Sequence, residues 1–209
     1  SVANFQRGFD RINVPSVLTT LVTDELDFPN LSMVGVDDRA AAYTAVDYLI
    51  RQGHRKIAVL GGPVTSYPSL MRRQGAQQAM EDAGIVFNDK LYGLSNYDFE
   101  SAYHAMNSLL ARRAEFTALF AMSDVIAFGA IRALVSAGLR VPEDVSVIGF
   151  DGITMSRYCV PVMTTIVQPS EQIALQSIEL LVRQIEHGSS AQTVTLQPEL
   201  QQGESVRAI

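Results

Sequence analysis

The sequence predicts an α/β protein built on a doubly wound, parallel sheet. Short apolar runs typical of buried strands alternate with stretches whose apolar residues recur at helical spacing. Three of these runs end in a carboxylate: LSMVGVDD at 31–38, ALFAMSD at 118–124 and VSVIGFDG at 145–152. Ligands of open α/β sheets bind beyond the carboxyl ends of the strands, so we expect the functional site there.

The strand-like runs are short and are bounded by polar residues or glycine, as buried strands are. They are VLTTLV at 17–22, LSMVGV at 31–36, KIAVLGG at 56–62, ALFAM at 118–122, DVSVIGF at 144–150 and TTIVQ at 164–168. The tail from Thr193 to Val206 is expected to be extended around Pro198.

The helical stretches between these runs begin at a polar residue that can cap a helix, and most end at a glycine. Helices are predicted from Asp37 or Asp38 to Gly53, from about Ser69 to Gly84, after Asp98, from Asp124 to Gly138, and from Ser170 to Gly188.

Composition narrows the class of protein. The 209 residues are 47% hydrophobic, and 16 basic against 22 acidic residues give a net charge of −6, which argues against a surface that neutralises nucleic-acid phosphates. A single cysteine, Cys159, excludes an internal disulfide framework and indicates a cytoplasmic protein. No segment is apolar enough to span a membrane, and the first residues, SVANFQRGFD, lack the apolar core of a signal peptide.

Local sequence leaves the roles of the strand-end residues open. Asp151 can accept two hydrogen bonds from a polyol or a base edge, or it can cap the following turn. Ser123 and Asp124 can contact a ligand, although Ser-Asp before an apolar helical run is also an ordinary helix cap. Arg72, in the first turn of a helix after a strand, can donate a planar fork to paired oxygens or be solvated. Tyr97 can stack on a sugar or purine ring or anchor its loop.

Catalytic and metal-binding interpretations find little support. His54, His104 and His187 show no metal-ligand spacing, and Cys159 has no neighbouring base. Nucleophile-elbow, phosphate-loop and dinucleotide-binding motifs do not occur in the sequence. The sequence therefore predicts a binding protein, not an enzyme, with no cofactor and no metal.

Three segments resemble the effector-binding core of LacI/GalR-family transcriptional repressors. They are RQGHRKIAVLGGP at 51–63, ALFAMSDVIAFGAIRALVSAGLRVPEDVSVIGFDG at 118–152 and PVMTTIVQP at 161–169. The resemblance runs from about Val14 to the end of the chain, and the stretch ending VPEDVSVIGFD carries it most specifically.

The resemblance implies a periplasmic-binding-protein-like fold, in which two α/β subdomains are joined by three chain crossings and hold the effector between them. Residues 1–53 and 167–190 would form an incomplete N-terminal subdomain, and residues 54–166 and 191–209 the C-terminal one. The DNA-binding headpiece of the family has no counterpart before Ser1, so operator DNA would be bound only through a segment outside this chain.

The resemblance also assigns roles to individual residues. Arg72, Asp151 and Gln168 are expected to grip the effector, and Tyr97, Ser123 and Asp124 occupy further ligand positions. Two positions depart from the family: Ser123 stands where Asn is usual, and Gly152 replaces a frequent second Asp. A homodimer is expected through the helix after Asp124 and the segment 158–161, with Phe128, Tyr158, Val160 and Pro161 at the interface.

The function implied by the resemblance is that of an effector-sensing, dimerising core. A small molecule, a sugar more than a nucleobase, would shift the relative orientation of the subdomains and so control operator binding. The alternative is the ligand-binding protein of a sugar transporter, which shares the fold but is exported.

Overall fold

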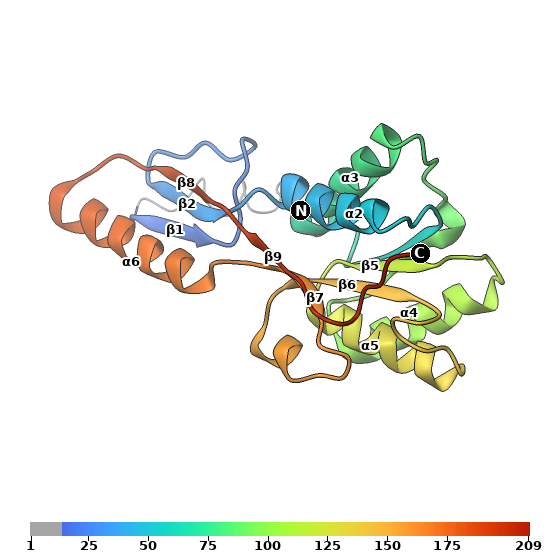
Figure 1. Cartoon of the computed structure of the whole chain (residues 1–209). Helices are drawn as coiled ribbons and strands as arrows, with labels where there is room; N and C mark the ends of the chain where they lie inside the picture. Colours follow the sequence, from blue (N-terminus) through green and yellow to red (C-terminus); the bar gives the residue numbers. More distant parts are fainter. Residues whose placement is uncertain (1–13) are drawn as a thin grey trace. The chain divides into compact units, whose positions relative to one another are not determined.

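The computed structural model describes residues 14–209, so the expectation about a signal peptide in SVANFQRGFD lies outside the described residues. The chain forms two compact units (Figure 1). The first comprises Ser1–Asp37 and Gln168–Pro198, and the second comprises Asp38–Val167 and Glu199–Ile209. Within the described residues, no helix is long and apolar enough to cross a membrane.

Within residues 14–209, the first unit is a small parallel sheet against which one helix packs. Its strands run in the order β1 (Ser16–Thr19), β2 (Leu31–Val36) and β8 (Thr193–Leu196), and α6 (Ser170–His187) packs against them. Val34 and Val36 of β2 and Ile173 and Leu180 of α6 form one buried cluster. Leu26, Leu31 and Met33 form a second. The helix ends at Gly188 with φ +61°, as its sequence predicts.

The second unit is a three-layer α/β structure. Its six strands run in the order β4 (Tyr92–Leu94), β3 (Ile57–Gly61), β5 (Ala118–Ala121), β6 (Ser146–Asp151), β7 (Thr164–Val167) and β9 (Glu199–Gln201). Every neighbouring pair is parallel except β7 and β9. Figure 1 shows the layers, with α2 (Asp38–Arg51) and α3 (Tyr67–Asp82) on one face of the sheet and α4 (Phe99–Ala111) and α5 (Asp124–Ser136) on the other. Two short 3₁₀ helices, η1 (Asp89–Leu91) and η2 (Thr154–Arg157), lie in its loops.

The alternation of strands and helices and the parallel sheets confirm the predicted fold class. Glycines end four of the predicted helices with positive φ angles, at Gly53, Gly84, Gly138 and Gly188. Strand β4 was not predicted, since three residues, YGL, are too few to show strand periodicity. Helix α3 begins two residues earlier than expected, because the Ser66 hydroxyl accepts the Ser69 N–H and caps it.

The two units differ from the expected subdomains in where α2 and the chain around β8 belong. Helix α2 lies in the second unit and packs closely against α3, where Gly75 permits the contact: a Cβ there would lie 2.0 Å from the carbonyl oxygen of Arg39. The chain around β8 lies in the first unit because β8 pairs with β2. The boundary expected near Gly53 therefore falls between Asp37 and Asp38 in the structure.

His54 joins the loop after α2 to the C-terminal segment of the second unit. His54 is 1% exposed, with Nε2 3.1 Å from the carbonyl oxygen of Arg207 and Nδ1 2.9 Å from Oγ1 of Thr117. A carbonyl oxygen only accepts, so Nε2 carries the proton and Nδ1 accepts from the Thr117 hydroxyl. Burial lowers the pKa of His54 and keeps the ring neutral.

We predict that the contribution of His54 to the free energy of unfolding falls as the pH is lowered through 6.5, the ordinary pKa of histidine. The unfolded chain takes up the proton there while folded His54 does not, so this contribution is complete above pH 6.5 and is lost as pH falls toward the lowered, folded pKa. His54→Gln should reduce this slope and lower the free energy of unfolding at pH 8 by about 1–3 kcal/mol. Denaturant titration between pH 5 and 8 measures both quantities.

The matched control is His104→Gln, which changes an exposed histidine on α4. It should leave the stability and its pH slope close to those of the parent chain. An equal loss of slope in both variants would contradict the assignment to His54.

Candidate functional site

The candidate site lies at the carboxyl ends of β3, β5 and β6, which are neighbours in the sheet of the second unit. From β3 the chain passes first to β4 on one side and then to β5 on the other, so the connections diverge next to β3. This is the topological switch point at which open α/β sheets bind ligands. The groups gathered there come from the end of β6, from α2 and α3, from the residue after β5 and from the loop before α4.

Arg72 is the centre of this cluster. It lies on α3, and its side chain is 7% exposed. Nε donates to Oδ1 of Asp38 at 2.7 Å, Nη1 donates to the carbonyl oxygen of Met122 at 2.5 Å, and Nη1 lies 3.5 Å from Oδ1 of Asp151. The guanidinium carbon lies 3.7 Å above the ring centroid of Phe150, which is cation–π geometry. The guanidinium is therefore fixed in position and orientation.

The charges around Arg72 keep it protonated. Burial alone would lower the pKa of Arg72, but the carboxylates of Asp38 and Asp151 outweigh that effect and the pKa is raised. Asp38 is as buried as Arg72, with a side chain 5% exposed, whereas the side chain of Asp151 is 27% exposed. Asp151 is thus the carboxylate of the cluster that a ligand can reach.

The backbone at Asp151 is strained in a way that sets the direction of its side chain. Asp151 has φ +111° and Gly152 has φ +69°, and the first of these values is rare for a residue with a side chain. A Cβ on Gly152 would lie 2.7 Å from Cα of Val167. The departure from the family at Gly152 therefore has a steric reason, since neither the turn nor Val167 leaves room for an aspartate.

Tyr97 lies in the loop between β4 and α4, with φ +61°. Its ring packs on the backbone of Gly62, where a Cβ would lie 2.0 Å from Cε2 of the ring. The hydroxyl group is buried and has no hydrogen-bond partner within residues 14–209. The structure therefore brings Tyr97, Arg72 and Asp151 to the same end of the sheet.

Ser123 and Asp124 make contacts inside the protein. The Ser123 hydroxyl accepts the Ile126 N–H at 3.1 Å and caps α5. Asp124 is 0% exposed; its Oδ1 accepts from the Thr165 hydroxyl at 2.6 Å and its Oδ2 from the Ile153 N–H at 2.8 Å. The capping interpretation of Ser123 thus matches its contacts, and Asp124 reaches the site only through the turn that it binds.

Gln168, Phe128, Tyr158 and Val160 are further residues that the sequence singles out. Gln168 belongs to the first unit, where its carbonyl oxygen accepts the Ser170 N–H, and its role in ligand binding stays a prediction. Phe128 is partly buried against the core of the second unit. Tyr158 and Val160, after η2, are 77% and 93% exposed.

Asp38 is the site residue that sequence reasoning missed. The run LSMVGVDD presents it as a strand-end carboxylate, but the local pattern predicts only a helix cap at this position. Its partner, Arg72, is 34 residues away in the sequence. The available signal was that Asp38 shares the pattern of Asp124 and Asp151.

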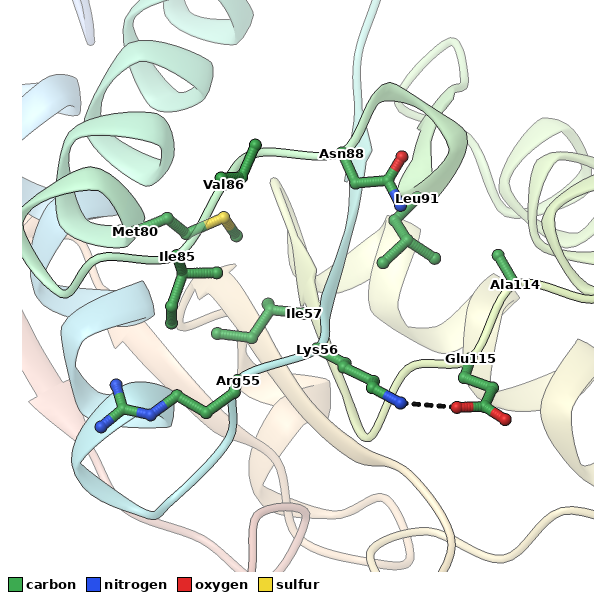
Figure 2. A pocket seen from close by; sticks show the side chains of 10 residues that line it. All are labelled: Arg55, Lys56, Ile57, Met80, Ile85, Val86, Asn88, Leu91, Ala114 and Glu115. Carbon is green, nitrogen blue, oxygen red and sulfur yellow. Dashed lines mark hydrogen bonds and ion pairs between the residues drawn. The ribbon is translucent and has the colours of Figure 1, made fainter.

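A separate pocket of about 350 Å³ opens at the opposite, amino-terminal end of the same sheet (Figure 2). Its apolar side chains include those of Ile57, Met80, Ile85 and Leu91. Lys56 and Glu115 form an ion pair with each other, with Nζ 2.5 Å from Oε2. Its polar groups do not converge as those around Arg72 do. We therefore assign the candidate site to the carboxyl ends of the strands.

The described residues contain no group of three or more histidine, cysteine or acidic side chains that could hold a metal ion. Cys159 is partly buried, and burial raises the pKa of its thiol, which disfavours the reactive thiolate.

Comparison with protein families identifies the domain. Residues 46–206 match the model of the periplasmic binding protein-like domain. The chain is 37% identical over 199 residues to the HTH-type transcriptional regulator MalR of Clostridium butyricum, covering 95% of this chain and 59% of that protein. It is also 37% identical over 172 residues to the HTH-type transcriptional repressor CytR of Escherichia coli, covering 82% of this chain and 50% of that one. The chain thus spans between half and about 60% of the length of these relatives.

Solved structures of regulators share the fold over nearly the whole chain. The complex of the transcriptional regulator CelR with cellobiose superimposes with a TM-score of 0.83 at 29% identity, covering 98% of this chain and 68% of that one. A sugar-binding LacI-family regulator from Escherichia coli, complexed with phosphate, gives 0.83 at 30% identity, covering 100% and 74%. A LacI-family regulator from Enterococcus faecium with bound ribose gives 0.85 at 25% identity, covering 100% and 76%.

These relatives are transcriptional regulators, not enzymes or transporter components. The domain match, the identities and the structural likeness agree on one family. The chain belongs to the LacI family of transcriptional regulators and forms their periplasmic binding protein-like effector-binding domain.

Proposed function

We propose that this chain binds a neutral sugar through Arg72 and Asp151 and transmits that binding to a DNA-binding segment outside the chain. The observation that carries the proposal is the fixed guanidinium of Arg72, held between Asp38 and the partly exposed Asp151 at the switch point of the sheet. A guanidinium donates to hydroxyl oxygens and a carboxylate accepts from hydroxyl groups, so the pair suits a polyol.

The charge of the cluster favours a neutral ligand over an anionic one. One arginine faces two aspartates, so the three side chains together carry one net negative charge. A sugar phosphate or carboxylate would meet this charge in a poorly solvated site, where repulsion is weakly screened. A neutral sugar avoids that cost and still uses both kinds of hydrogen-bonding group.

Tyr97 supports the same class of ligand. A buried hydroxyl without a partner costs free energy, and a sugar hydroxyl at this place would remove that cost. The ring adds an aromatic surface of the kind that sugars stack on. Two structurally similar regulators hold sugars, cellobiose in one and ribose in the other, which makes these two molecules suitable probes.

The proposed mechanism couples this site to DNA through a change in conformation. An effector that binds one conformation of the domain more tightly shifts the population toward it, and the attached DNA-binding segments respond. This role places the protein in the cytoplasm, where operator DNA lies, and it makes the domain a sensor without enzymatic activity.

Arg72→Lys tests the proposal directly. Lysine keeps the positive charge between Asp38 and Asp151 but loses the planar fork that donates to several acceptors at once. We expect the affinity for the sugar that binds the parent chain, ribose or cellobiose, to fall at least tenfold in isothermal titration calorimetry. Alanine is a poorer choice, because buried Asp38 would lose its partner at a cost of about 3–5 kcal/mol in stability.

The neighbouring arginine supplies a matched control. Arg73 faces away from the cluster, toward Asp89 and the rings of Phe87 and Tyr92, so Arg73→Lys should leave sugar affinity within about twofold. Unchanged affinity in Arg72→Lys, with the fold retained by circular dichroism, would rule out the assignment of Arg72.

We further propose that the chain forms a homodimer through the segment around η2. Met155, Tyr158 and Val160 are 59%, 77% and 93% exposed, a concentration of apolar surface that is typical of a protein interface. Phe128 and Pro161 would complete it, as the resemblance to the family predicts.

Val160→Asp should weaken the dimer at least tenfold, because a charge would be buried without a partner at the interface. Sedimentation equilibrium measures the dissociation constant. Val86→Asp is the control, since Val86 is similarly exposed, at 90%, in the loop after α3. A dimer weakened equally by both substitutions, or by neither, would contradict an interface around η2.

A further inference from the structure

Asp124 lies directly behind the turn that presents Asp151. It is the first residue of α5, and its carboxylate is completely buried. Oδ2 accepts the N–H of Ile153 at 2.8 Å, and the backbone N–H of Gly152 lies close enough to the carboxylate to lower its pKa. Oδ1 accepts from the hydroxyl of Thr165 on β7. One carboxylate thus joins the start of α5, the end of β7 and the turn after β6.

The turn needs such support because its backbone is strained. Asp151 adopts φ +111° and Gly152 φ +69°, conformations that persist only where surrounding contacts fix them. The two amide groups held by Asp124 directly follow Asp151. Releasing them would let Asp151 relax and rotate its side chain away from Nη1 of Arg72, 3.5 Å away.

We propose that Asp124 is a positioning residue for effector binding, whose carboxylate holds the amides of Gly152 and Ile153 and so keeps Asp151 directed at Arg72. The inference rests on the proposed function for its effect on affinity. The effect on the turn itself can be measured without any ligand.

The titration of Asp124 makes this arrangement sensitive to pH. Burial raises the pKa of Asp124, and the hydrogen bonds from Thr165 and Ile153 lower it. Burial has the larger effect, so the pKa is about 6. Two other titratable groups interact with it: Asp151, whose charge raises the pKa further, and the thiol of Cys159. Below pH 6 the protonated acid no longer offers two full acceptors, so the hold on the turn weakens.

Nuclear magnetic resonance of the ¹⁵N-labelled chain tests the turn. The amide signals of Gly152 and Ile153 should shift with a midpoint near pH 6. Asp124→Asn should abolish this transition, while Thr165→Val should raise its midpoint because it removes a donor that lowers the pKa of Asp124. Asp144→Asn, at the opposite end of β6, is the matched control and should leave the midpoint unchanged.

Calorimetry with ribose and cellobiose tests the consequence. At pH 7.5, Asp124→Asn should weaken sugar binding roughly tenfold. The side chain loses its charge, and an NH2 group, which donates, replaces one of the two carboxylate oxygens that accept hydrogen bonds. In the parent chain, the affinity for the sugar should fall between pH 7.5 and 5.5. In Asp124→Asn this fall should be smaller, although the variant still contains Asp151, because the pH dependence comes from Asp124.

The outcomes separate the two proposals. Amide signals that do not titrate in the parent chain, or that titrate equally in Asp124→Asn, would overturn the positioning role whatever the ligand. If the amides behave as expected but neither sugar binds the parent chain, the choice of sugar fails while the hold on the turn stands. Full affinity in Asp124→Asn would overturn the link to effector binding.

Discussion

The buried ion pair between Arg72 and Asp38 is the interaction on which the candidate site depends. A charge this far from water is tolerated only when its hydrogen-bonding groups are matched, and here Asp38, the Met122 carbonyl oxygen and Asp151 match it. Asp38 begins α2 and Arg72 lies on α3, so the pair also joins the two helices that cover one face of the sheet. The same ion pair therefore stabilises the close packing of α2 against α3 and fixes the orientation of the guanidinium.

This constraint explains why Asp151 can serve a ligand while remaining ordered. Asp38 already neutralises Arg72, so Asp151 is a second, more distant carboxylate, at 3.5 Å against 2.7 Å. A sugar hydroxyl can therefore bind Asp151 without leaving the guanidinium unpaired in the protein interior. If Asp151 were the sole partner of Arg72, ligand binding would have to break the ion pair first, and the cost would weaken binding.

Sequence patterns predicted the fold well because the spacing of apolar, capping and glycine residues reflects secondary structure, which depends on neighbours in the sequence. The apolar faces of α2, α3 and α4, the cap at Asp98 and the glycine stops all appear in the structure, since each depends on residues within a turn or two. On α6, by contrast, Ile178, Val182 and Ile185 are exposed, although their spacing is helical. The pairing of Asp38 with Arg72 could not be predicted this way, because it depends on two helices meeting. For Asp124 the local pattern offered a ligand or a cap, whereas the structure shows a carboxylate turned toward β7 and the turn after β6.

The burial of Asp124 carries a cost that its stabilising contacts do not fully offset. A folded pKa of about 6 against an ordinary 3.8 means that ionising Asp124 opposes folding by roughly 2–3 kcal/mol at neutral pH. Asp124 therefore adds most to the free energy of unfolding below pH 3.8, where it is protonated, and this contribution is lost as the pH rises through 6. This pH dependence is opposite in sign to that of His54. An asparagine would avoid the cost but would supply one acceptor to two amides. A chain selected for stability alone would gain by that exchange, whereas a chain that must hold Asp151 in a strained backbone needs the carboxylate.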